Sequence, residues 1–104
     1  MNFYKEPTGY FKTALSELQG AWEMLREAVV EEFGFQNSDK LLFHIDEAMS
    51  WESVRNLNLM EPLILLIHNI AKQSDASKSI TECIDDVRNS FDAVIEAMKE
   101  GKVQ

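Results

Sequence analysis

The sequence predicts an all-α fold: a single-domain bundle of four to five helices over residues 1–104, with long amphipathic first and last helices. Apolar residues recur at steps of three and four over long stretches near both ends of the chain. No stretch shows the two-residue alternation of a strand or an Asn-Gly or Asp-Gly hairpin turn. The chain has 104 residues, 45% of them apolar, which suits one domain with one buried core.

The first long helix is expected over residues 11–33, after an irregular lead-in at residues 1–9. Gly34 follows it, at the point where a left-handed residue commonly ends a helix. Gly20 lies inside this helix, where glycine costs about 1 kcal/mol relative to alanine, and would permit a close crossing by another helix or a slight bend. The apolar stripe of this helix comprises Phe11, Leu15, Leu18, Trp22, Leu25, Val29 and Phe33.

A second helix is expected after three capping residues, Asn37, Ser38 and Asp39. This helix should end near Met49, with Ser50 capping a further short turn over residues 51–55. Its apolar face comprises Leu41, Leu42, Ile45, Ala48 and Met49.

The next segment is the most apolar part of the chain. Residues 56–61 are read either as a loop or as frayed helix, and Pro62 suits the first position of a helix because its missing N–H is not needed there. Residues 63–71 are apolar on nearly all sides, which predicts the buried central helix, with a buried strand as the competing interpretation.

The last long helix is expected after a polar loop at residues 74–78. Ser79 and Glu82 have the spacing of a capping box, and Gly101 should end the helix ahead of a frayed tail at residues 102–104. The apolar stripe comprises Ile80, Ile84, Val87, Phe91, Val94 with Ile95, and Met98.

Composition excludes several classes of function. The chain has 18 acidic and 10 basic residues and a formal charge of -8, which argues against nucleic acids and anionic membranes as partners. Its single cysteine, Cys83, excludes an intramolecular disulfide and favours a reducing compartment. Residues 63–67 form the longest strongly apolar run, too short to span a membrane, and the first residues do not read as a signal peptide. We therefore expect a cytoplasmic protein.

No pattern in the sequence predicts catalysis, a cofactor or a metal site. Neither His44 nor His68 has a glutamate three residues before it, as a di-iron bundle requires. His44 is expected to be structural or solvated, His68 a hydrogen-bonded core residue, and Cys83 a small apolar residue. Glycine-rich phosphate loops and nucleophile elbows are absent from the sequence. The chain is therefore expected not to be an enzyme.

The acidic residues are arranged in rows. Glutamates recur every four residues in the first long helix, and carboxylates do the same in the last, although like charges at this spacing repel by about 0.2–0.5 kcal/mol per pair. One interpretation is a solvated face that aids solubility. The other is a docking surface for a basic protein, anchored by an aromatic residue such as Trp51 or Tyr10. The predicted partner-binding residues are Glu23, Glu27, Glu31, Asp46, Glu47, Trp51, Glu52, Asp92, Glu96 and Glu100.

A short, acidic, helical chain without a catalytic motif resembles the all-helical immunity proteins of bacterial contact-dependent growth inhibition systems. The resemblance covers the whole chain in size, charge, helical class and lack of motif. It implies stoichiometric inhibition of a cognate toxin, often a basic nuclease, whose cationic RNA-binding cleft the acidic rows would occupy as phosphate mimics. Charge reversal at Glu27 and at Glu96 is then expected to slow association.

Two other functions stay open at this point. A helical adaptor or secretion chaperone would mask an amphipathic segment of its partner. It predicts an exposed apolar groove and a homodimer in which the long first and last stripes pair between chains. A small-molecule or metal binder built around His44, Asp46 and Glu47 is the third hypothesis. The sequence does not decide between a monomer and a homodimer.

Overall fold

The computed structural model describes residues 9–54 and 56–101, with side chains between residues 13 and 99. These residues form helices and connecting turns, without a strand, which confirms the all-α prediction. The expected lead-in and tail fall largely outside the described residues, although Gly9 already belongs to the first helix. The four helices are α1 (Gly9–Glu31), α2 (Ser38–Ser53), α3 (Leu57–Gln73) and α4 (Lys78–Gly101).

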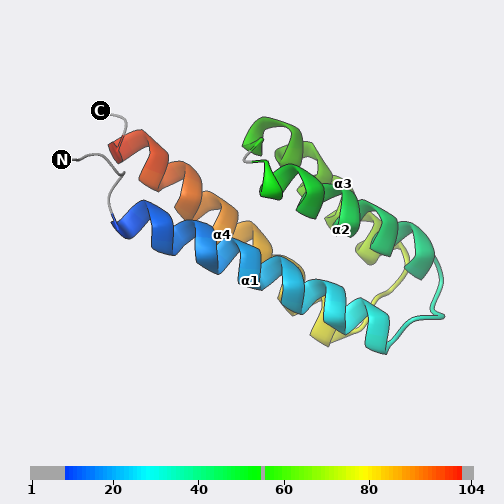
Figure 1. Cartoon of the computed structure of the whole chain (residues 1–104). Helices are drawn as coiled ribbons and strands as arrows, with labels where there is room; N and C mark the ends of the chain where they lie inside the picture. Colours follow the sequence, from blue (N-terminus) through cyan, green and yellow to red (C-terminus); the bar gives the residue numbers. More distant parts are fainter. Residues whose placement is uncertain (1–8, 55, 102–104) are drawn as a thin grey trace.

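The helices run alternately up and down, and each packs against its neighbours in the chain. Helix α4 also lies beside α1, so that the four helices form a ring in which α1 does not contact α3, and α2 does not contact α4. Helices α1 and α4 have 23 and 24 residues, against 16 and 17 for α2 and α3. One end of the α1–α4 pair therefore extends beyond α2 and α3 (Figure 1).

The core lies along the two long stripes, as predicted. From Leu15 to Val29 and from Ile80 to Val94, the main stripe positions are buried, and α2 and α3 add residues such as Ile45 and Ile67. The two stripes differ from the prediction at their ends, because Phe33 and Met98 are exposed. Trp22 is buried as expected, and among the described residues its indole Nε1 has no hydrogen-bond partner.

The turn after α1 explains why Phe33 leaves the core. The helix ends at Glu31, two residues earlier than predicted, and Gly34 then has a φ of 114°. The amide N–H of Gly34 donates to Ser38 Oγ at 3.1 Å. Asn37 takes a left-handed φ of 66° and does not cap α2 with its side chain, which instead donates to Ser74 Oγ at 3.0 Å. Asn37 thus joins the α1–α2 turn to the α3–α4 turn.

Helix boundaries in the middle of the chain differ from the prediction. Helix α2 continues to Ser53 rather than ending near Met49, so the proposed separate short turn is part of it. Helix α3 begins at Leu57, where the side chain of Asn56 accepts the N–H of Leu59 at 3.3 Å. Pro62 therefore lies inside α3 instead of at its first position. Burial of Leu57 and Met60 explains the early start, because both belong to the packed face of the helix.

Helix α3 is not the buried central helix that the sequence predicted, nor is it a strand. Its buried face contacts α2 and α4, whereas Leu59, Leu65 and Leu66 are exposed. Apolar residues on all sides of α3 therefore do not mean that the helix is completely buried, because three of its leucines are exposed to solvent.

Helix α4 begins close to the predicted position but with a different cap. Ser77 Oγ accepts the N–H of Ile80 at 3.3 Å, so Ser77 caps the helix and the predicted Ser79–Glu82 box is wrong. No helix in the described ranges is long and apolar enough to cross a membrane.

Candidate functional site

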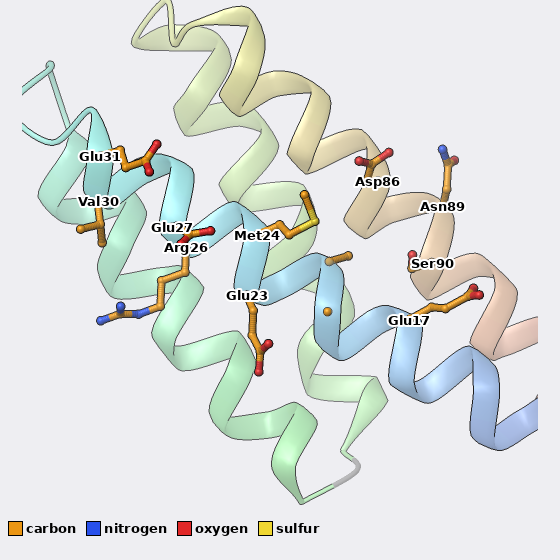
Figure 2. Close-up of a pocket in the computed structure, with 12 residues that line it drawn as sticks. Glu17, Glu23, Met24, Arg26, Glu27, Val30, Glu31, Asp86, Asn89 and Ser90 are labelled. Carbon is orange, nitrogen blue, oxygen red and sulfur yellow. The ribbon is translucent and has the colours of Figure 1, made fainter.

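An open groove runs along the outer surface of α1 beside α4 (Figure 2). Its volume is about 1090 Å³. Helix α1 supplies most of its lining, and α4 supplies Asp86, Asn89 and Ser90. We call this surface the acidic groove, because five carboxylates line it: Glu17, Glu23, Glu27, Glu31 and Asp86.

The acidic groove also contains two exposed apolar side chains, Met24 and Val30. Met24 is 61% exposed and, in Figure 2, extends from α1 toward α4, while Val30 is also exposed. Gly20 lines the groove, and a Cβ atom placed on it would meet nothing within 4 Å. Gly20 therefore does not permit a close helix crossing, as the sequence had suggested, but leaves the groove open. A solvent-exposed methionine offers an adaptable apolar contact.

Arg26 is the one basic residue in the lining of the acidic groove, and its side chain pairs with a carboxylate on α2. Arg26 Nε donates to Asp46 Oδ1 on α2 at 2.7 Å. This hydrogen bond, together with the charge of Asp46, raises the pKa of the Arg26 guanidinium. Figure 2 shows Arg26 projecting away from α4. Within residues 9–54 and 56–101, none of the five groove carboxylates forms an ion pair, so the groove presents uncompensated negative charge.

The structure brings three of the predicted partner-binding residues together. Glu23, Glu27 and Glu31 are exposed and line the acidic groove. Asp46 is exposed on α2 but is held by Arg26. Glu47 is half-buried, and its Oε1 lies 3.2 Å from His44 Nδ1.

The remaining predicted residues do not join the groove. Trp51 is half-buried and packs against the core, and Glu52 is only 6% exposed, so neither residue belongs to the acidic groove. Asp92 lies on the α3 side of α4, beside Glu61 and Arg88. Glu96 is exposed on α4 but is not part of the groove lining. The side chains of Glu100 and Tyr10 lie outside the described residues.

Sequence reasoning missed the α4-facing side of the groove. Glu17, Ala21 and Met24 each precede a buried position of the α1 stripe by one residue, which places them along the edge that faces α4. The position of these three residues relative to the buried stripe could be derived from the sequence alone. What the sequence lacked was the identity of the neighbouring helix, without which Asp86 could not be assigned to the same surface.

The other candidate groups do not form a reactive site. The described part of the chain contains no cluster of three or more His, Cys, Asp and Glu side chains that could hold a metal ion. His44 contacts Glu47, but Asp46 is held by Arg26 instead. The three residues of the metal-binding hypothesis, His44, Asp46 and Glu47, therefore do not converge as a ligand set. His68 is half-buried in a crevice beside Thr81 and Asp85 rather than in the core, and forms no hydrogen bond with the described residues.

Cys83 is expected to react slowly near neutral pH. Partial burial raises the pKa of its thiol, and the negative charges of Asp86 and Glu82 raise it further. Since the thiolate is the nucleophile, iodoacetamide should alkylate the folded chain more slowly at pH 7.4 than the urea-unfolded chain, which has a thiol pKa of about 8.5. The rate-against-pH profile separates this effect from simple shielding. A folded-state midpoint at or below the unfolded one would contradict the prediction.

Comparison with known proteins finds no matching family model, no matching curated protein and no matching solved structure, so the acidic groove is interpreted from its own geometry and charge.

Proposed function

We propose that this chain is a protein-binding module whose acidic groove receives a basic segment of a partner protein. The observation that carries the proposal is that the groove combines the exposed side chains of Met24 and Val30 with five carboxylates, none of which forms an ion pair within the described part of the chain. Carboxylates around the rim attract and orient lysine and arginine side chains. The exposed side chain of Met24, on the side of α1 that faces α4, supplies apolar surface that is desolvated when a partner docks.

The partner that fits this surface best is a cationic bacterial toxin, with the chain acting as its immunity protein. A nuclease toxin needs a positively charged cleft to hold its phosphate-rich substrate. A groove with five carboxylates matches such a cleft and would exclude the substrate from it by binding there. In this proposal the chain performs no reaction and acts in the cytoplasm, where a nuclease toxin would find its substrate.

Charge reversal within the acidic groove should weaken capture of a basic partner. We expect Glu27→Lys to slow association with a synthetic lysine- and leucine-rich amphipathic helix about fivefold at low salt, because a rim charge acts mainly on the association rate. Stopped-flow fluorescence with a labelled peptide measures this rate. Glu96→Lys is the matched control, since it changes the net charge equally at an exposed site outside the groove.

The same two variants test the biological proposal. The product of the neighbouring gene is co-expressed with the unmodified chain, with Glu27→Lys or with Glu96→Lys, and growth is recorded. Protection by the unmodified chain and by Glu96→Lys, but less by Glu27→Lys, would support immunity through the groove. Equal loss in both variants would indicate that total charge, not the groove, directs binding. No protection and no toxin-like neighbour would refute the immunity function while leaving the peptide result to stand.

A helical adaptor or secretion chaperone is the second candidate, and a different observation favours it. Leu59, Leu65 and Leu66 are exposed on α3, which gives the apolar surface such a function requires. The first and last stripes pair within the chain, in α1 and α4, so a homodimer of this candidate would form through another surface. Partner capture that fails in Leu66→Asp but survives in Glu27→Lys would identify this function.

A further inference from the structure

Gly20 lies inside α1 at a place where the fold itself does not require a glycine. Glycine weakens the interior of a helix relative to alanine, and it is needed where the backbone takes a positive φ or where another group approaches closely. Gly20 does not take a positive φ, unlike Gly34, and a Cβ atom on it would meet nothing within 4 Å. The described part of the chain therefore leaves the space over Gly20 open, and this space belongs to the acidic groove.

Gly20 belongs to a row of groove residues on one face of α1, which we call the α1 row. Its members follow one another at steps of three and four residues, and the row is about 21 Å long. They are Glu17, Gly20, Met24, Glu27 and Glu31. Carboxylates stand at both ends of the row, and its two uncharged members lie between them. Because Met24 carries a long, exposed side chain, Gly20 forms a notch beside it.

The spacing of the α1 row fits a partner segment that is itself helical. Steps of three and four residues correspond to about 4.5 and 6.0 Å along a helix axis, and a second helix lying alongside repeats the same alternation. An extended segment presents a side chain to one face about every 6.6 Å, which exceeds both steps. The side chains of an adjacent helix can therefore stay in register with the row from Glu17 to Glu31.

The charges of the α1 row determine which side chains such a helix needs. A lysine or arginine is required opposite Glu17 at one end, and two more are required opposite Glu27 and Glu31 at the other. Arg26, the one basic residue in the groove lining, does not compete for these carboxylates, because it pairs with α2 and projects away from α4. Between the basic positions, one large apolar side chain faces Gly20.

We propose that the partner segment is a basic amphipathic helix that lies along the α1 row and places a large apolar side chain over Gly20. That side chain packs against the exposed Met24, and its burial supplies the desolvated contact between the charged ends of the row. Asn89 and Ser90 contribute uncharged groups from α4 to the same surface. This inference rests on the proposed function, since it specifies the form of the basic segment that the acidic groove receives.

Two synthetic peptides that differ at one position test the role of the notch. Both consist of alanine and glutamine, which favour a helix, with lysines spaced to meet the three carboxylates of the α1 row. One peptide has phenylalanine opposite Gly20 and the other has alanine there. Each is made in the forward and in the reversed sequence, because a helix can lie along α1 in either direction. In one of these directions, the phenylalanine peptide should bind the unmodified chain about tenfold more tightly, as measured by fluorescence anisotropy.

Gly20→Leu should remove this preference, because the leucine fills the notch. The affinity for the phenylalanine peptide should fall about tenfold, while the affinity for the alanine peptide should change little. Since a Cβ atom at this position meets nothing within 4 Å, the variant should fold, which circular dichroism confirms. Gln19→Leu is the matched control, because Gln19 is exposed on α1 and does not line the groove, so both affinities should be unchanged. Bound peptide should also gain helical signal.

Different results would overturn the two parts of this inference. Equal affinity of the two peptides for the unmodified chain, or an equal loss of both in Gly20→Leu, would overturn the role of the notch. Binding without a gain in helical signal would overturn the helical partner. In both cases, slower association of Glu27→Lys with a basic peptide would leave the proposed function standing. If no basic peptide binds at all, the proposed function fails together with this inference.

Discussion

Replacing Phe91 with alanine should lower the free energy of unfolding by about 3–5 kcal/mol, whereas Phe33→Ala should change it by about 0.5 kcal/mol or less. Each residue belongs to one of the two predicted apolar stripes, but Phe91 is 4% exposed and Phe33 is 53% exposed. Truncation at Phe91 removes a large apolar side chain and leaves a cavity between packed helices. Urea denaturation followed by circular dichroism measures both values on chains of equal net charge.

The size of this effect makes a second variant useful. Small domains have total stabilities of about 5–15 kcal/mol, so Phe91→Ala approaches the unfolded state. Phe91→Leu keeps much of the side-chain volume and should cost less than the alanine variant, which preserves a measurable transition if the alanine variant does not fold. Equal losses at Phe91 and Phe33 would mean that the first stripe continues past Glu31 into the core, as the sequence alone predicted.

The long stripes were predictable because burial imposes the helical period on the sequence directly. Leu18, Leu25, Ile84 and Val94 occupy positions where any polar residue would be desolvated, so the pattern is strict there. Phe33 continued the numerical pattern by chance, since it lies in the turn after α1. Periodicity describes the face of a helix, but it does not state where the chain leaves the helix.

The middle of the chain was harder to predict, because some of its apolar residues are not buried. Residues 63–71 carry leucines on several sides, and composition alone makes them a central helix. In the structure α3 occupies a corner of the ring and has two neighbours, so one side of it faces solvent. Composition therefore identified a helix and failed to identify its place in the bundle.

The candidate site could also be predicted only in part from the sequence. Glu23, Glu27 and Glu31 could be grouped from the sequence, because they belong to one helix at a fixed spacing. Adding Asp86, and separating Asp92 from the groove, required knowing which side of α4 faces α1 and which faces α3. No spacing within a single helix contains that information.

Replacing Pro62 with alanine should raise the free energy of unfolding by about 2 kcal/mol. Pro62 lies inside α3, where proline lacks the N–H that would bond to the carbonyl of Asn58 and its ring crowds that carbonyl, at a cost of about 3 kcal/mol. Proline also restricts the unfolded chain, which offsets about 0.4–1 kcal/mol of that cost. Thermal denaturation measures the net gain, which corresponds to a rise of several degrees in Tm.

Asn69→Ala provides the control, because Asn69 is exposed on the same helix and its replacement changes only helix propensity, by about 0.5 kcal/mol or slightly more. The comparison decides where α3 begins. At the first position of a helix proline costs nothing, because no hydrogen bond is lost there. If Pro62→Ala gains no more than Asn69→Ala, the helix starts at Pro62, as the sequence predicted. A clearly larger gain requires the earlier start at Leu57, which places Leu59 and Leu66 on one continuous face.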